Sequence, residues 1–80
     1  MKNNLSNNAI IYALLALDGE ISLQREYLES DAVPDEDLDG ENELLEDLEQ
    51  AFMEFVDVYK ERRHEDNELP TLEDLLENSL

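Results

Sequence analysis

The stretch "ESDAVPDED", residues 29–37, divides the chain into two long segments. Pro34 disfavours a helical conformation at Val33, and its fixed backbone angle suits the first turn of a new helix. The acidic residues after Pro34 would lie at the positive end of that helix's dipole. Helices joined by so short a connection are usually antiparallel neighbours. The break therefore predicts that one helix ends near residue 29 and that a second begins near residue 35.

Both flanking segments repeat apolar residues at steps of three and four, which is the spacing of one helical face. The upstream stripe has Gln24 at its polar position and otherwise consists of Ile10, Leu14, Leu17, Ile21 and Leu28. The downstream stripe has Glu41 at its polar position and otherwise consists of Leu38, Leu45, Leu48, Phe52, Phe55 and Tyr59. We expect the two stripes to pack against each other, with the aromatic residues in the core rather than in a cofactor site.

Signals for helix ends occur at two further places. Ser6 can cap the first helix by accepting a hydrogen bond from an amide of its first turn. After "DNELP", residues 66–70, Thr71 and Asp74 resemble a capping box with Asp in place of the usual Glu. A short amphipathic helix would follow, with an apolar side formed by Leu72, Leu75, Leu76 and Leu80.

The expected fold is all-α. We predict one small domain over residues 1–80, in which an antiparallel helical hairpin, with helices near residues 7–29 and 35–64, is closed by a short C-terminal third helix near residues 72–78. Every residue from 9 to 17 is apolar, so this part of the first helix exceeds what one partner helix can cover. Either the third helix or a second copy of the chain would cover the rest, and we favour a homodimeric bundle.

Four residues bear on that dimer. If the chain dimerises, Ile11 and Leu15 are the expected contacts between two copies. Tyr12 and Tyr27 fall further from the stripe and suit either an interface or an ordinary amphipathic surface. The sequence does not separate these arrangements.

The charge of the chain limits the classes of molecule that we expect it to bind. The sequence has 23 Asp and Glu against 5 Lys and Arg, a net charge of -18, together with 41% apolar residues, which is enough to fold. Such a charge repels phosphate backbones and anionic lipids, so we expect no direct nucleic-acid binding and no membrane binding. The apolar run at residues 9–17 is shorter than the roughly 20 residues that span a bilayer. The absence of cysteine excludes a thiolate metal site and fits a cytoplasmic protein.

The stretch "DEDLDGENELLE", residues 35–46, fits the calcium-loop pattern D-x-[DN]-x-[DN]-G-x5-E. In a calcium loop, Asp35, Asp37 and Asp39 would supply oxygens, Gly40 the sharp turn and Glu46 a bidentate carboxylate. Three observations oppose calcium. Pro34 would interrupt the incoming helix, an aliphatic residue is missing at position 42, and the chain has no second loop. We interpret the stretch as the first turns of the second helix, and a calcium-binding protein stays an alternative.

No pattern of catalytic residues occurs. The sequence lacks a Gly-rich phosphate loop, and its single histidine, His64, has no Ser or Cys nucleophile in a recognisable arrangement. Carboxylate pairs are so frequent here that they indicate nothing by themselves. We therefore expect no enzyme activity, no catalytic residues and no cofactor.

The remaining interpretation is a small acidic binding or regulatory protein that engages a basic protein partner. Its contact surface is expected on the outer face of the second helix and includes Glu46, Glu49 and Glu54. An alternative is a DNA mimic that inhibits a nucleic-acid-binding protein, because duplex DNA presents one charge per about 1.7 Å of its axis. A structural subunit whose charge only confers solubility is the third possibility.

Overall fold

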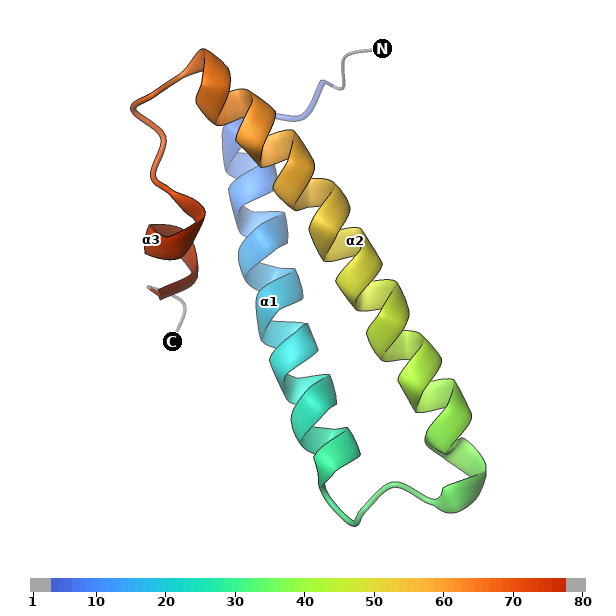
Figure 1. Cartoon of the computed structure of the whole chain (residues 1–80). Helices are drawn as coiled ribbons and strands as arrows, with labels where there is room; N and C mark the ends of the chain where they lie inside the picture. The colour runs from blue at the N-terminus through green and yellow to red at the C-terminus, as the bar shows by residue number, and fades with distance from the viewer. Residues whose placement is uncertain (1–3, 78–80) are drawn as a thin grey trace.

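The computed structural model describes residues 4–77, which form helices joined by short turns (Figure 1). Helix α1 spans Asn7–Glu29, α2 spans Leu38–Glu65 and α3 spans Leu72–Glu77, and one 3-10 turn, η1, spans Asp35–Asp37. No strand occurs within the described range. The predicted all-α class, with two long helices followed by a short one, is confirmed. The last expected position of the third helix, residue 78, and Leu80 lie outside the described residues.

Both ends of α1 are closed by local hydrogen bonds. The Ser6 hydroxyl accepts from the Ala9 amide at 3.0 Å, which confirms the predicted N-cap. At the other end, the Ser30 amide donates to the carbonyls of Glu26 and Tyr27, and the Ser30 hydroxyl donates to the Tyr27 carbonyl at 2.6 Å. These bonds satisfy backbone groups that the last helical turn leaves without an intrahelical partner.

The break at Pro34 lies where the sequence predicts it, but α2 begins one turn later than expected. Pro34 is extended, with φ -60° and ψ 143°. The Asp37 amide therefore donates to the Pro34 carbonyl three residues earlier, at 2.9 Å, and closes a 3-10 turn. The α-helical bonding pattern starts at Leu38 and continues to Glu65.

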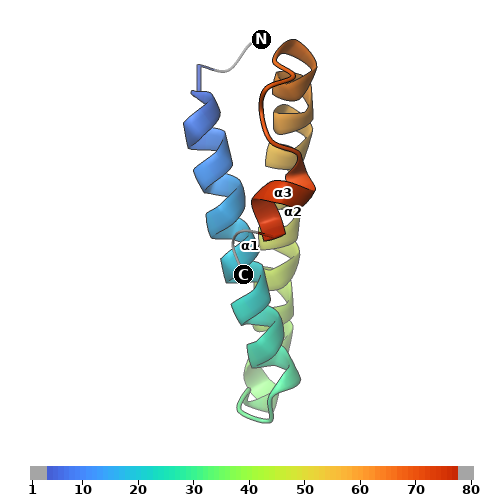
Figure 2. The ribbon, with the colours of Figure 1, turned by 90° about the vertical axis from the view of Figure 1, so that its left-hand side faces the viewer.

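The long helices α1 and α2 run in opposite directions and lie side by side along their length (Figures 1 and 2). The polar positions of the two apolar stripes meet in the contact between them. The Gln24 side-chain amide donates both to the Glu41 carbonyl, at 3.0 Å, and to the Glu41 carboxylate, at 3.2 Å. A polar residue in each stripe thus satisfies the other, and neither interrupts the packing.

The tightest part of the core lies at the end of the pair that is remote from the turn. Ile10 and Leu14 of α1 pack there with Val56 and Tyr59 of α2, each at most 5% exposed. Half-buried side chains surround this cluster: Ile11, Phe52, Phe55, Val58, Leu69, Leu72 and Leu75. Nearer the turn, Ile21 is the buried residue of α1. The stripes predicted from the sequence supply all of the fully buried residues named here except Val56.

Two side chains of α2 hold the segment between α2 and α3 against the long helices. Tyr59 donates its hydroxyl hydrogen to the Pro70 carbonyl, and Arg63 donates from Nε to the Leu69 carbonyl at 3.2 Å. Burial raises the pKa of the Tyr59 phenol above its ordinary value of 10.0, and the nearby Arg63 guanidinium partly opposes that rise. The Thr71 hydroxyl accepts from the Asp74 amide at 3.1 Å and closes the first turn of α3.

The return of α3 changes the expected role of Ile11. The apolar side of α3 packs beside the first half of α1, where Leu72 and Leu75 join the core cluster (Figure 2). Ile11 packs against that same cluster and Leu15 is half-buried, so the two residues expected to join two copies are covered largely within one chain. None of the helices in residues 4–77 combines the length and the apolar content needed to cross a bilayer.

Candidate partner-binding surface

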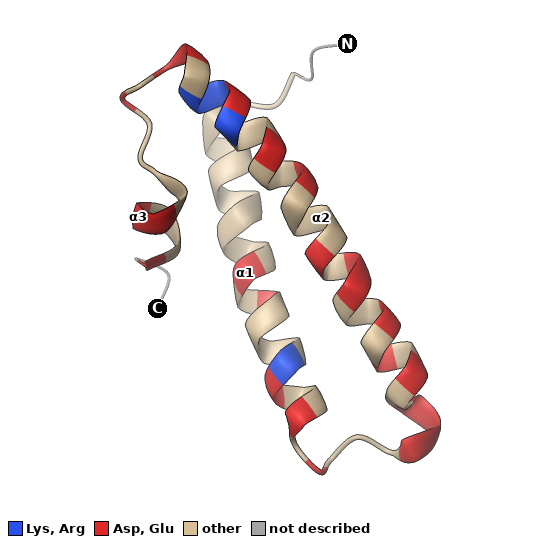
Figure 3. Ribbon diagram, in the orientation of Figure 1, with Lys and Arg blue, Asp and Glu red and all other residues tan. Residues whose placement is uncertain are grey.

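Acidic residues follow α2 along its length (Figure 3). Most of them recur at steps of three and four, so their side chains project from one side of the helix. We call this side the acidic face, and it consists of eight exposed residues: Asp39, Glu43, Glu46, Asp47, Glu54, Asp57, Glu61 and Glu65. Gln50, also exposed, fills the gap in its middle. At 1.5 Å per residue the acidic face is about 39 Å long.

The acidic face exists because the opposite side of α2 is buried. Phe52, Val56 and Tyr59 follow one another at steps of four and three and pack toward α1 and α3. Carboxylates lose hydration when they are buried, so the folded chain keeps them on the side remote from this contact. None of the eight carboxylates is in an ion pair with another described residue.

The three glutamates that the sequence predicts on one contact surface lie on two different sides of α2. Glu46 and Glu54 are exposed on the acidic face. Glu49 lies on the side of α2 that faces α1, where its carboxylate forms an ion pair with the Arg25 guanidinium. Because the pair is partly exposed, it contributes about 0–1 kcal/mol. Glu49 therefore helps to join the two helices and stands apart from Glu46 and Glu54.

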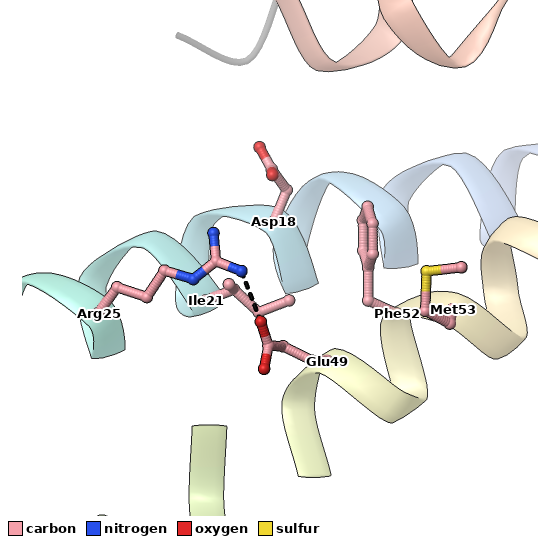
Figure 4. Close-up of a pocket in the computed structure, with 6 residues that line it drawn as sticks. All are labelled: Asp18, Ile21, Arg25, Glu49, Phe52 and Met53. Carbon is pink, nitrogen blue, oxygen red and sulfur yellow. Dashed lines mark hydrogen bonds and ion pairs between the residues drawn. The ribbon is translucent and has the colours of Figure 1, made fainter. Parts of the chain in front are cut away.

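This ion pair borders a small pocket in the groove between α1 and α2 (Figure 4). The pocket has a volume of about 240 Å³ and is lined by Asp18, Ile21, Arg25, Glu49, Phe52 and Met53. In Figure 4, the Arg25 and Glu49 side chains meet across the groove while the Asp18 carboxylate points away from Glu49. The lining thus offers an apolar patch beside a neutralised charge pair. The sequence did not predict this pocket, because it depends on how two distant segments pair.

The basic residues of α2 gather at its C-terminal end (Figure 3). Lys60, Arg63, His64 and Asn67 line a shallow, open pocket there of about 340 Å³. Two cations near this pocket have structural partners, because Arg63 donates to the Leu69 carbonyl and Arg62 donates to the Asn7 side chain at 2.8 Å. These cations also lie at the negative end of the α2 dipole. They are therefore remote from the middle of the acidic face.

The calcium-loop pattern at residues 35–46 adopts helical structure. Its first three residues form η1 and the others belong to α2, and Gly40 does not have a positive φ. In a calcium loop the residue at position 41 would bind the ion through its carbonyl, but here the Glu41 carbonyl accepts from Gln24. Asn42 donates to the Leu38 carbonyl at 3.0 Å, within the same helix. Within residues 4–77, no three His, Cys, Asp or Glu side chains gather as a metal site would require.

The acidic face has a uniform chemistry along its length. Its carboxylates are exposed, of one sign and held in register by a rigid helix, so they can accept hydrogen bonds and ion pairs from lysine and arginine side chains. Comparison with known proteins found no matching family model, no matching curated protein and no matching solved structure.

Proposed function

We propose that this chain is a small acidic, non-enzymatic binding protein whose acidic face on α2 engages a basic protein partner in the cytoplasm. The observation that supports the proposal most is the continuity of the acidic face, in which eight exposed carboxylates lack cationic partners within the described chain. Like charges on one helix repel one another, and a basic partner would relieve that repulsion on binding.

The density of charge favours a basic protein over occupation of a DNA-binding site. A DNA duplex as long as the acidic face, about 39 Å, carries about 23 phosphate charges. The acidic face carries eight. The neighbouring helix could extend it into a second row over only half of its length, because residues 7–17 of α1 contain no charged side chain. Clusters of lysine and arginine on a protein surface match a sparser field of this kind.

The proposal predicts a specific loss on charge reversal. The partner would first be captured by the full chain from an extract of the native host and then purified. Reversing Glu46 and Glu54 to Lys should weaken the complex by about tenfold or more, since each reversal replaces an attraction by a repulsion. The association rate of the unaltered chain should fall steeply as the salt concentration rises.

The matched control has the same net charge. Glu26→Lys with Glu29→Lys reverses two exposed carboxylates of α1 and leaves the acidic face intact. This control should bind almost as tightly as the unaltered chain. Equal losses in both double variants would show that only total charge matters. An association rate that ignores salt would show that the acidic face does not guide binding at all.

Self-association is a second proposal, and it concerns α1 rather than α2. The homodimeric bundle expected from the sequence is supported by large apolar side chains that stay exposed on α1 after α2 and α3 have packed: Tyr12, Leu23 and Tyr27. Size-exclusion chromatography with light scattering, over a series of concentrations, tests this proposal directly.

A further inference from the structure

The side of α1 that faces away from α2 presents an apolar surface to solvent. Its members recur at steps of four and three, and we call this surface the α1 outer face: Asn8, Tyr12, Ala16, Gly19, Leu23 and Tyr27. Tyr12 is 70% exposed, Leu23 61% and Tyr27 38%. These side chains lie opposite Leu14 and Ile21, which are buried toward α2. Within residues 4–77, neither of the other helices covers this face.

Gly19 at the centre of the α1 outer face has no explanation within the described chain. A Cβ added at Gly19 would meet no atom within 4 Å, and the residue does not have a positive φ. Glycine inside a helix is destabilising relative to alanine. Small side chains at Ala16 and Gly19 would allow the backbone of a second helix to approach closely. Gly40 of α2 also has open space around it. Within two turns of Gly40, however, Leu44 is the one large apolar residue of α2 that is exposed.

A second copy of the chain is the occupant that best fits the charge of the α1 outer face. Each copy carries a net charge of -18, so two copies repel each other wherever their carboxylates meet. The α1 outer face contains no charged residue, and the acidic face lies on the other helix. Glu20 and Glu26 border these side chains, so a basic partner would find few carboxylates here. Two copies that meet here bury apolar surface and keep their acidic faces apart.

The spacing along the α1 outer face gives the orientation of the two copies. Successive members are separated by four, four, three, four and four residues, and this series reads the same in both directions. Two α1 helices that cross antiparallel about the midpoint of Ala16 and Gly19 therefore place Tyr12 opposite the second copy's Leu23. The same operation places the small residues opposite each other and Tyr27 opposite Asn8, whose side-chain amide oxygen can accept from the phenol. Such a two-fold contact is self-complementary.

We infer that the α1 outer face is the interface of an antiparallel homodimer, centred between Ala16 and Gly19. This inference rests on the self-association proposed above and adds its surface and symmetry. The antiparallel arrangement also separates the flanking carboxylates, because Glu20 lies opposite Leu15 and Glu26 lies opposite Ala9 of the other copy. A parallel arrangement would bring each of these glutamates beside its own counterpart, where like charges repel.

The first test is Gly19→Gln. Gly19 is exposed, a Cβ there meets no atom within 4 Å, and Gln has a higher helix propensity than Gly, so the variant should keep its helical circular dichroism. It should nevertheless lose the dimer, because the side chain fills the space that the second α1 needs. Gly40→Gln is the matched control, since it adds the same side chain in open space on α2 and should leave the dimer unchanged.

The outcomes separate the interface from self-association itself. If the unaltered chain is monomeric at every concentration, both self-association and the assignment of its interface are overturned. A dimer that survives Gly19→Gln keeps self-association and overturns the assignment to the α1 outer face. If a variant loses its helical signal, Tyr12→Glu with Leu23→Glu replaces it, because both positions are exposed and the monomer tolerates charge there.

The second test measures orientation by disulfide formation. The chain has no cysteine, so Tyr12→Cys and Leu23→Cys chains can be mixed and oxidised without a background from native thiols. An antiparallel dimer should give mainly the mixed disulfide, which joins one chain of each variant. Positions 12 and 23 lie about 16 Å apart along the helix axis, so the thiols of two Tyr12→Cys chains in an antiparallel dimer are too far apart to join.

Two results of this experiment would contradict the inference. If disulfides form predominantly between two Tyr12→Cys chains, the antiparallel orientation is overturned. If the mixed pair cross-links no faster than a Glu54→Cys control, whose thiol lies on the acidic face, the assignment of the interface is overturned.

Discussion

At the scale of single residues, Tyr59 connects all three helices. Its ring is fully buried in the cluster that α1 and α2 form, and its hydroxyl donates to the Pro70 carbonyl just before α3. A side chain with an apolar ring and a polar end suits such a place, because the ring fills the core while the hydroxyl satisfies a backbone acceptor. The raised pKa of Tyr59 follows from the same burial.

Stability should therefore fall at alkaline pH through Tyr59. Its pKa in the folded chain lies above the ordinary 10.0, so folding favours the protonated phenol. This contribution is complete below pH 10.0 and is lost as the pH rises from there through the folded-state pKa. Over that window the free energy of unfolding should decline by at most about 1.4 kcal/mol per pH unit from this group.

Urea titrations at a series of pH values measure this decline, and Tyr59→Phe should make it shallower. The variant should also lose about 0.5–1.5 kcal/mol at neutral pH, because the hydrogen bond to Pro70 disappears. An equally steep alkaline decline in both chains would assign the effect to other groups.

At the scale of elements, the sequence predicts the helices well because each carries its own signals. The stripe from Ile10 to Leu28, the cap at Ser6 and the break at Pro34 are all local features. The place of α3 depends instead on contacts between residues far apart in sequence. For that reason no local pattern indicated that Val56 would be buried beside the stripe, or that Ile11 would pack within the chain. The position of Glu49 on the side of α2 that contacts α1 was equally hard to predict, because it depends on how α2 pairs with α1.

The first turns of α2 should become more stable on substitution of Gly40 by Ala. The backbone there is helical without a positive φ, and a Cβ would meet nothing within 4 Å. The change should add about 0.4–1 kcal/mol to the free energy of unfolding, mainly by restricting the unfolded chain. Thermal unfolding with and without calcium measures it, and the gain should be the same in both. Stabilisation by calcium that Gly40→Ala abolishes would instead indicate a loop at residues 35–46.

At the scale of the whole molecule, the two long helices differ in the charge of their surfaces. The first half of α1 is uncharged, α2 carries the acidic face, and the cations of α2 gather at its C-terminal end (Figure 3). With 23 acidic and 5 basic residues, repulsion among carboxylates exceeds what the Arg25–Glu49 pair offsets. The folded state brings these charges closer together than the unfolded chain does.

Added salt should therefore stabilise the chain. Raising the sodium chloride concentration from about 10 mM to 100 mM shortens the screening length from about 30 Å to 10 Å, which weakens repulsion along the acidic face. The unfolding midpoint should rise over this range, and rise less in the variant that carries Glu46→Lys and Glu54→Lys. The measurement is best made in Gly19→Gln, which is expected to be monomeric, so that dissociation of a dimer does not contribute. A midpoint that falls with salt would show that favourable ion pairs outweigh the repulsion.

The position of the core relative to the turn has a consequence for the order of folding. Residues 30–37 bring the adjoining ends of α1 and α2 together over a short closed loop, which forms rapidly. The tightest packing, however, joins Leu14 to Val56, and its formation closes a loop of about 40 residues at a correspondingly higher entropy. The contact between the two helices should thus form first beside the turn, although its most stable part lies at the other end. Amides beside the turn should exchange with solvent through small local openings, whereas those around Leu14 and Tyr59 exchange only when the whole chain unfolds.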